Sequence, residues 1–173
     1  MQIELRQVGF KNKGAELMLL SACSKIRNEY EDCKIGIGVT SIAGDYIQRA
    51  GLQLYQIPKL WRFNNQLGIA ANYIPKKIAT NFGIMQPKAI DVVLDCAGFA
   101  YTDQWGLSIA KELHDSVKRC KDNGSKFIFL PQAFGPFKNK KIRKEISKAL
   151  LLADHIFVRD SKSLLYISEL API

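Results

Sequence analysis

The chain has 173 residues, the length of one ordinary domain, which buries roughly 70% of its unfolded surface on folding. Its formal charge of +9 attracts anions of any kind, so charge alone does not choose among phosphorylated metabolites, lipid headgroups and nucleic acid. The four cysteines, Cys23, Cys33, Cys96 and Cys120, lack CxxC spacing, which argues against a zinc site or a disulfide framework and indicates a reducing compartment.

The first residues, MQIELRQV, alternate like a strand and lack the long apolar core of a signal peptide. No apolar run elsewhere approaches the length of a transmembrane helix. We therefore expect a soluble, cytoplasmic protein.

Strand and helix patterns alternate through the first half of the chain. Ile3 to Val8 predicts a strand, and a helix follows from about Gly14 to Tyr30. Two more strands, Lys34 to Val39 and Leu52 to Ile57, flank a short helix near Asp45 to Ala50. The expected apolar stripe of the long helix consists of Leu20, Cys23, Ile26 and Tyr30. The region Leu60 to Met85, rich in Asn and aromatics and broken by Pro75, fits either a helical excursion or a flexible flap.

The second half is more regular. Strands are predicted at 89–95, Lys126 to Leu130 and His155 to Val158, and helices at 106–122, at 139–153 and from Ser161. The expected core positions of the first two helices are Leu107, Ala110, Leu113, Val117 and Cys120, then Ile142, Ile146, Leu150 and Ala153. This alternation predicts a single Rossmann-like α/β domain over residues 1–173, with a mainly parallel sheet of about six strands in a three-layer arrangement.

Four loops each follow a predicted strand and precede a predicted helix. They are GFKNKGAE (Gly9 to Glu16), DCAGFAYTDQWG (Asp95 to Gly106), PQAFGPF (Pro131 to Phe137) and RDSKS (Arg159 to Ser163). Because the carboxyl ends of parallel strands meet at one edge, all four loops are expected there. Open α/β sheets bind their ligands at that edge.

The loop DCAGFAYTDQWG combines carboxylates, an amide and aromatic rings. Asp95, Tyr101, Asp103, Gln104 and Trp105 form a mixture suited to sugar hydroxyls and sugar rings. The alternative is a well-ordered loop whose glycines make turns and whose aromatics plug the end of the sheet.

The first loop places Asn12, Lys13 and Gly14 where a helix begins, so free backbone amides there could hold a phosphate or a carboxylate. The glycines form neither GxGxxG nor GxxxxGK[ST], and ordinary turn chemistry is the alternative. The basic segment KNKKIRK, from Lys138 to Lys144, is interpreted as a solvated helix face, because no aromatic residues interleave with its charges to stack on nucleic-acid bases.

The segments NKGAELML, DCAGFAYTDQWG, PQAFGPF and RDSKSLLYI, in this order and spacing, resemble the polysaccharide pyruvyl transferase family, and the resemblance extends from residue 9 to residue 168. It implies a two-domain, glycosyltransferase-B-like enzyme that moves the pyruvyl unit of phosphoenolpyruvate onto a sugar as a ketal. Compared with that two-domain pattern, the chain corresponds to the N-terminal domain of the family. The resemblance therefore implies a C-terminal domain as its partner.

Pyruvyl transfer of this kind requires a general acid, a base for the sugar hydroxyl, and cations for the donor. Asp95 and Asp103 are the candidate catalytic residues that orient or deprotonate the acceptor diol. Tyr101 and Trp105 would bound the sugar ring, and Arg159 would clamp the anionic donor. Gln132 and the amides near Gly135 would add hydrogen bonds, as would Gln104.

Each of these roles has a structural alternative. Asp95 can cap a turn, Trp105 can belong to the core, and Arg159 can pair with Asp160. His114 falls in a predicted helix and His155 at the start of a strand, so neither is assigned as the general acid, which the resemblance places in the second domain. Cys96 is interpreted as a small packing residue.

Three functions follow as hypotheses. The first is one half of a pyruvyl transferase for cell-surface polysaccharide, which would be inactive in isolation. The second is a glycosyltransferase-like domain that uses a nucleotide sugar, and the third is a non-catalytic sugar- or anion-binding module. The expected partners are phosphoenolpyruvate as donor substrate, a saccharide acceptor that is free or lipid-linked, and the second domain. We expect no further cofactor, no metal ion and no nucleic acid. Homodimer formation through an apolar face and peripheral association with the inner face of the membrane are further expectations.

Overall fold

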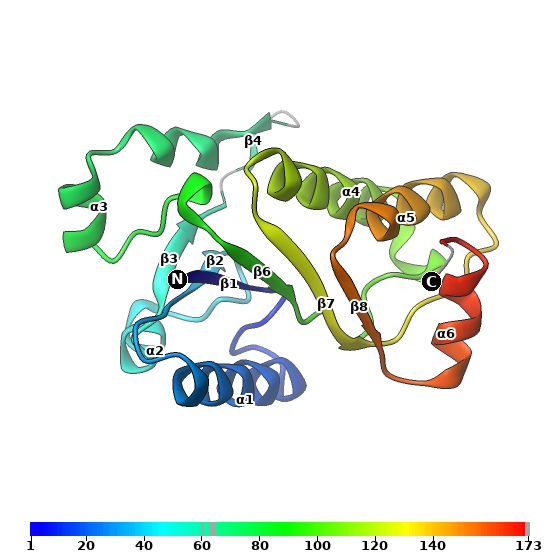
Figure 1. The fold of residues 1–173 in the computed structure, drawn as a ribbon, viewed down its shortest axis with the longest axis horizontal. Helices are drawn as coiled ribbons and strands as arrows, with labels where there is room; N and C mark the ends of the chain where they lie inside the picture. The colour runs from blue at the N-terminus through cyan, green and yellow to red at the C-terminus, as the bar shows by residue number, and fades with distance from the viewer. Residues whose placement is uncertain (60, 63–64, 172–173) are drawn as a thin grey trace. The chain divides into compact units, whose positions relative to one another are not determined.

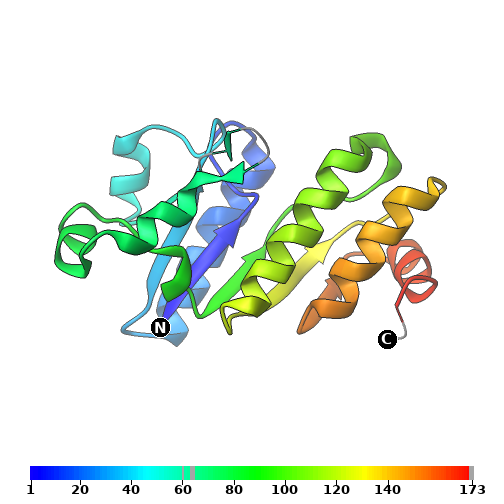
Figure 2. The same ribbon diagram turned by 90° about the horizontal axis from the view of Figure 1, so that it is seen from above.

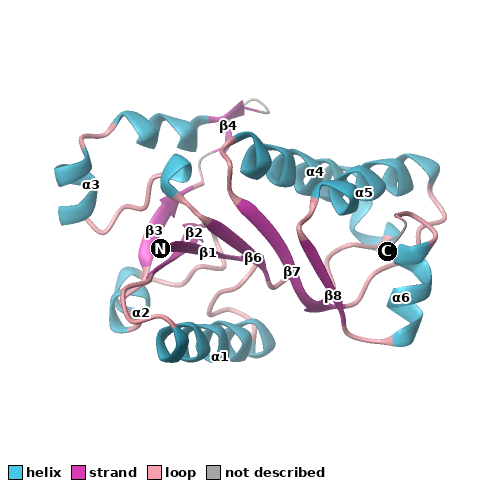
Figure 3. Cartoon of the chain, viewed as in Figure 1, coloured by secondary structure: helices cyan, strands magenta, loops and turns pink. Residues whose placement is uncertain are grey.

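The computed structural model describes residues 1–59, 61–62 and 65–171, and its elements alternate between strand and helix (Figures 1 and 3). The strands are β1 (Gln2–Arg6), β2 (Lys34–Val39), β3 (Tyr55–Pro58), β4 (Trp61–Arg62), β5 (Asn65–Gln66), β6 (Val92–Asp95), β7 (Lys126–Gln132) and β8 (His155–Val158). The helices are α1 (Lys13–Glu29), α2 (Tyr46–Gly51), α3 (Lys76–Asn81), α4 (Gly106–Asp122), α5 (Lys140–Leu152) and α6 (Ser161–Ser168), with 3-10 helices η1 (Leu67–Tyr73), η2 (Pro87–Ala89) and η3 (Asp103–Trp105).

The sheet has six strands in the order β3-β2-β1-β6-β7-β8, and β4 and β5 form a separate antiparallel pair. The pairs β1–β2, β2–β3 and β7–β8 are parallel. This is the α/β, Rossmann-like arrangement expected from the sequence. The chain divides into two compact units, 1–93 and 94–173, and each is described below by itself.

In the first unit, helices lie on both sides of the strands: α1 and α2 on one side, η1 and α3 on the other (Figures 1 and 2). Helix α1 buries Leu19, Cys23 and Ile26. Asp45 starts α2 with a capping box, accepting from the Gln48 N–H at 2.8 Å.

The second unit packs α4 and α5 side by side on one face of its strands, with α6 on the other (Figures 1 and 2). Helix α4 buries Ala110, Leu113, Val117 and Cys120 of its predicted stripe, and α5 buries Ile142, Ile146, Ala149 and Leu150. The two remaining predicted core positions, Leu107 and Ala153, are only half-buried, because they lie at the ends of their helices. Aromatic rings fill the interior beneath the two helices, because Phe127, Phe129, Phe134 and Tyr101 contact one another in edge and stacked pairs. This packed aromatic interior lies beneath the loops at the carboxyl ends of β6 and β7.

Two sequence expectations about the elements are wrong. In α1, Leu19 faces the core instead of Leu20, and Tyr30 is exposed as the C-cap residue. The strand expected at 89–95 begins only at Val92, because Pro87 starts a 3-10 turn. Of the region Leu60 to Met85, residues 60 and 63–64 lie outside the described part; the rest contains η1 and α3, which fits the helical excursion.

Candidate functional site

Three of the four predicted loops belong to the second unit, and they meet at the carboxyl ends of β6, β7 and β8. The Ala133 N–H donates to the Gly98 carbonyl at 2.9 Å, joining the loop after β7 to the loop after β6. The Arg159 N–H donates to the Gln132 carbonyl at 3.1 Å, which adds the loop after β8. The sequence therefore placed these three loops correctly at one edge.

Asp95, the last residue of β6, lies at the centre of this edge with no solvent-exposed surface. Among its contacts, the Tyr101 hydroxyl donates to one carboxylate oxygen at 2.7 Å, and the Ala97 N–H donates to the other at 3.2 Å. The loop folds back over the carboxylate, so Asp95 has no open path to an acceptor diol in this structure. Its catalytic role stays a prediction.

Tyr101 is buried with Asp95, being only 1% exposed. Its ring stacks on Phe134 at a centroid distance of 6.2 Å, and its carbonyl accepts from the Gly135 N–H at 3.0 Å. In this structure the ring is therefore not free to bound a sugar, contrary to the sequence expectation. An aromatic ring in a loop carries no sequence signal that separates a core position from a binding position.

Gln132, the last residue of β7, is also completely buried. Its amide nitrogen donates to Asp95 at 3.4 Å, whereas its Oε1 atom has no hydrogen-bond partner among the residues the structure describes. A buried acceptor without a donor is costly, of the order of 1–3 kcal/mol. Within the described part of the chain, this oxygen is therefore an unsatisfied buried acceptor at the end of β7.

The backbone around Gly135 leaves no room for a side chain. Its φ of +75° favours glycine, and a Cβ there would lie 2.5 Å from the ring of Tyr166. The Gly135 N–H already donates to the Tyr101 carbonyl, and the substrate contact expected of the amides near Gly135 stays a prediction. The residue shapes the loop.

Asp103 opens η3 and is partly exposed. Its carboxylate accepts from the backbone N–H groups of Lys138 at 2.5 Å and of Asn139 at 3.3 Å, which fixes the start of α5. Asn139 in turn caps α5 by accepting from the Lys141 N–H at 2.9 Å. Asp103 therefore holds two loops together, and its predicted catalytic role is untested.

Gln104 and Trp105 are exposed, as a substrate-contacting pair requires. The Trp105 side chain is 52% exposed, yet its indole N–H donates to the Phe99 carbonyl at 3.0 Å. An exposed ring that is held in one orientation provides a preformed face for stacking. Of the predicted sugar contacts, Trp105 is the one whose placement suits that role best.

Arg159 begins the loop after β8 with its side chain 58% exposed. Its Nε lies 3.8 Å from Asp160, too long for a hydrogen bond, while Asp160 accepts from the Ser163 N–H at 2.8 Å and caps α6. That backbone bond lowers the pKa of Asp160, assisted by the Arg159 charge. Most of the guanidinium fork therefore remains accessible to an anion.

The loop after β1 belongs to the first unit. Asn12 caps α1, accepting from the Gly14 N–H at 2.8 Å and the Ala15 N–H at 3.4 Å. These two amides were expected to be free, but in the structure they are bonded to Asn12. Lys13 is exposed and pairs with Glu16 at 2.7 Å. Gly9 is needed for packing, because a Cβ there would lie 2.0 Å from the Ile42 carbonyl oxygen. This loop shows ordinary capping chemistry, and its role in anion binding stays a prediction.

The histidines lie outside the loops, as predicted. His114 on α4 contacts Glu145 on α5, with 2.9 Å between Nδ1 and Oε2, and His155 is exposed at the amino end of β8. Cys96 is buried with its thiol 3.5 Å from the Leu94 carbonyl, which fits a packing residue. Among the described residues there is no group of three His, Cys, Asp or Glu side chains that could hold a metal ion.

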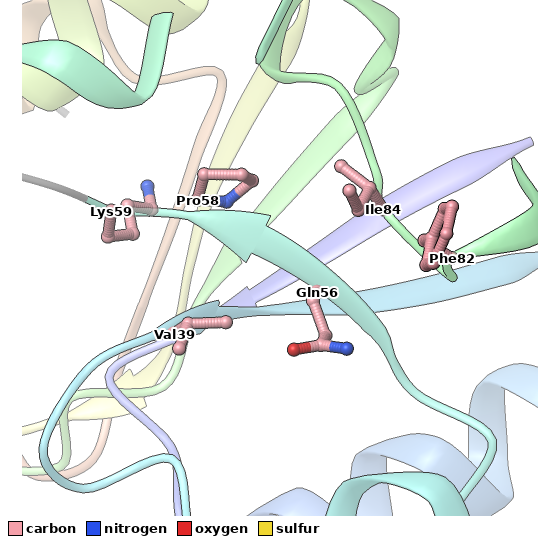
Figure 4. Close-up of a pocket in the computed structure, with 6 residues that line it drawn as sticks. All are labelled: Val39, Gln56, Pro58, Lys59, Phe82 and Ile84. Carbon is pink, nitrogen blue, oxygen red and sulfur yellow. The ribbon is translucent and has the colours of Figure 1, made fainter. Parts of the chain in front are cut away.

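The first unit also carries a hollow of about 480 Å³, lined by Val39, Gln56, Pro58, Lys59, Phe82 and Ile84 (Figure 4). It lies where β2 and β3 end. Lys59 pairs with the buried Glu4 at 2.9 Å, its chain crossing Gly38. None of the predicted site residues is among its lining residues.

Together the fold and its loops define a parallel α/β domain that presents polar and aromatic loops at the carboxyl ends of its strands. The family model described as polysaccharide pyruvyl transferase matches residues 12–171. The chain therefore belongs to the polysaccharide pyruvyl transferase family. Neither the curated proteins nor the solved structures gave a match. No helix in the described part of the chain has the length and apolar character needed to cross a membrane.

Proposed function

We propose that the chain is one half of an enzyme that transfers the pyruvyl group of phosphoenolpyruvate to a pair of sugar hydroxyls as a ketal. The observation that carries the proposal is the convergence of three loops at one edge, with Trp105 and Arg159 exposed above a buried polar network. The family membership supports the reaction class. A stacking face and an exposed cation are what an acceptor sugar and an anionic donor require.

The reaction needs a defined order of bond changes. Protonation of the methylene carbon of phosphoenolpyruvate makes the adjacent carbon electrophilic, and one sugar hydroxyl attacks that carbon while losing its proton. The C–O bond to phosphate then breaks, phosphate leaves, and the second hydroxyl closes the ketal with loss of its own proton. Of the two hydroxyl protons, one restores the general acid and the other leaves with the phosphate. The products are the ketal and inorganic phosphate, and no oxidant or reductant takes part.

The residues divide these tasks by their exposure. Trp105 and Gln104 contact the acceptor, and Arg159 binds the carboxylate or phosphate of the donor. Asp95 acts as a positioning residue: it holds Tyr101 and Gln132 beneath the loop. Asp103 positions the loop against the start of α5. The general acid belongs to the second domain that the family resemblance implies.

The test is an assay of the chain joined to, or mixed with, that second domain. With phosphoenolpyruvate and a panel of sugars, we expect phosphate release together with a product mass that corresponds to one added pyruvyl ketal. Arg159→Ala should raise the KM for phosphoenolpyruvate about tenfold or more, as expected for loss of a charged contact, whereas Lys162→Ala, an exposed neighbour, should not. Affinity for a nucleotide sugar with none for phosphoenolpyruvate would refute the proposal.

A further inference from the structure

A hollow of about 320 Å³ lies on the second unit, lined by Leu107 and Lys111 from α4 and by Lys141, Lys144 and Glu145 from α5. Leu107 and Lys111 are four residues apart, so they share one face of α4. Lys141, Lys144 and Glu145 likewise share one face of α5. Helices α4 and α5 lie side by side (Figures 1 and 2), and three lysines from them line one opening.

The carboxylate in this hollow is already engaged. Glu145 accepts from Lys148 at 3.0 Å and contacts His114 at 2.9 Å. Burial alone would raise the pKa of Glu145, but the hydrogen bonds and charges of Lys148 and His114 outweigh it and lower the pKa. Glu145 is therefore ionised at neutral pH, with its charge offset by Lys148.

The three lysines that line the hollow differ from neighbouring lysines in their lack of a carboxylate partner among the described residues. On α4, Lys118 pairs with Asp122 at 2.7 Å, and Lys121 pairs with Asp154 at 2.7 Å. Within the part of the chain that the structure describes, no side-chain hydrogen bond or ion pair is present for Lys111, Lys141 or Lys144. Three uncompensated like charges around one opening repel one another, which lowers stability.

We propose that this hollow binds a multiply charged phosphate group, with diphosphate as its simplest form. Lysine binds phosphate as a point charge, and a group with two or more negative charges and several acceptor oxygens can contact three lysines at once. A single carboxylate offers one charge and two oxygens, which suits three separated donors less well. The volume lies at the small end of ligand pockets, which fits a phosphate group rather than a large organic ligand.

The sequence did not predict this site. Lys141 and Lys144 fall in the basic segment that was interpreted as a solvated face, and their exposure agrees with that interpretation. Nothing in the spacing, however, brings Lys111 to them from about thirty residues away. The packing of α4 against α5 creates the cluster.

The experiment measures binding of inorganic diphosphate to the 173-residue chain by calorimetry at low salt, so it is independent of catalysis. We expect the triple variant Lys111→Gln, Lys141→Gln, Lys144→Gln to bind about tenfold more weakly or worse, because it loses three charged contacts to the anion. The matched control is Lys76→Gln, Lys77→Gln, Lys88→Gln, which removes the same charge from exposed lysines of the first unit. This control should bind diphosphate as the wild type does.

Replacing the three lysines of the hollow by arginine keeps the charge and should keep binding, and diphosphate should raise the melting temperature of the wild type but not of the glutamine triple variant. Equal loss of binding in both glutamine triples would show that net charge alone attracts the anion and would overturn the proposal. Absence of diphosphate binding by the wild type would overturn it as well.

Two further arms identify the source of the phosphate. Binding to phosphatidylglycerol vesicles that excess diphosphate does not reverse would mean a membrane-facing surface instead of a phosphate pocket. Displacement of diphosphate by phosphoenolpyruvate, with loss of binding in Arg159→Ala, would assign the lysines to the donor site. The proposal expects neither result: diphosphate binding should survive Arg159→Ala unchanged.

Discussion

The carboxylate of Asp95 illustrates how one buried residue organises a loop. Its two oxygens accept from the Tyr101 hydroxyl and the Ala97 N–H, and Gln132 reaches it from the next strand. A buried carboxylate is stable only where such donors replace water. The network therefore fixes the loop that carries Trp105.

Asp95→Asn should lower the free energy of unfolding by about 1–3 kcal/mol. The amide nitrogen that replaces one carboxylate oxygen would face either the Tyr101 hydroxyl or the Ala97 N–H, and both of these groups are donors. Denaturant unfolding at neutral pH measures this change. Tyr101→Phe should cost about 1 kcal/mol by removing one hydrogen bond, and Asp122→Asn, on the exposed face of α4, should change little. Unchanged stability in Asp95→Asn together with lost turnover would instead favour a direct catalytic role for the carboxylate.

Trp105 is the exposed counterpart of this buried network. Trp105→Ala should raise the KM of the complete enzyme for its sugar acceptor about tenfold, the loss expected from removing a stacking ring. The melting temperature should change little, since the side chain is half exposed. Trp105→Phe separates two causes: it keeps a ring but loses the bond to Phe99, so it should retain part of the affinity. An unchanged KM in Trp105→Ala would show that the indole does not contact the acceptor.

At the scale of the elements, Asp154 ties helix α4 to strand β7. Its carboxylate accepts from Lys121 at 2.7 and 2.8 Å and from the Phe127 N–H at 2.7 Å. Burial alone would raise the pKa of Asp154, but the Lys121 and Phe127 hydrogen bonds outweigh it and lower the pKa. The folded state therefore holds the ionised form more strongly than the unfolded chain does.

The sign of the pH effect follows from that lowered pKa. The stability that Asp154 provides is complete above its unfolded pKa, near 4, and is lost as the pH falls through the lower folded value. Melting temperatures at several pH values between 7 and 3 should fall less steeply in Asp154→Asn than in the wild type. A parallel pair of curves would mean that the Asp154 contacts do not contribute to acid sensitivity.

Most elements could be predicted from the sequence because their apolar spacing is unambiguous, as in α4 with Leu113 and Val117. The face of α1 could not, because leucines stand at positions 17, 19 and 20 and two stripes fit the same period. The candidate site was predicted as a set of loops but not as contacts. The Asp95–Gln132 and Asp103–Lys138 hydrogen bonds join residues that are 37 and 35 positions apart, so no local sequence pattern predicts them.

At the scale of the whole molecule, the question is which catalytic groups the chain supplies. Its only histidines are His114 and His155. His114 contacts Glu145 on the helix face of the second unit, and His155 lies at the amino end of β8, away from the loop that carries Arg159. Proton donation to the carbon of phosphoenolpyruvate needs an acid within hydrogen-bond reach of that carbon. Neither histidine lies in one of the four loops that follow the strands.

We therefore predict that residues 1–173 alone release no phosphate from phosphoenolpyruvate with any sugar, while the same chain combined with the second domain does. A cationic centre also has to be kept from water, which a closed site between two domains achieves better than an open loop edge. A coupled phosphate assay measures both preparations, and His114→Ala and His155→Ala should leave the rate of the combined preparation unchanged. Phosphate release by the chain alone, abolished in Arg159→Ala, would instead show that the complete catalytic set lies within these loops.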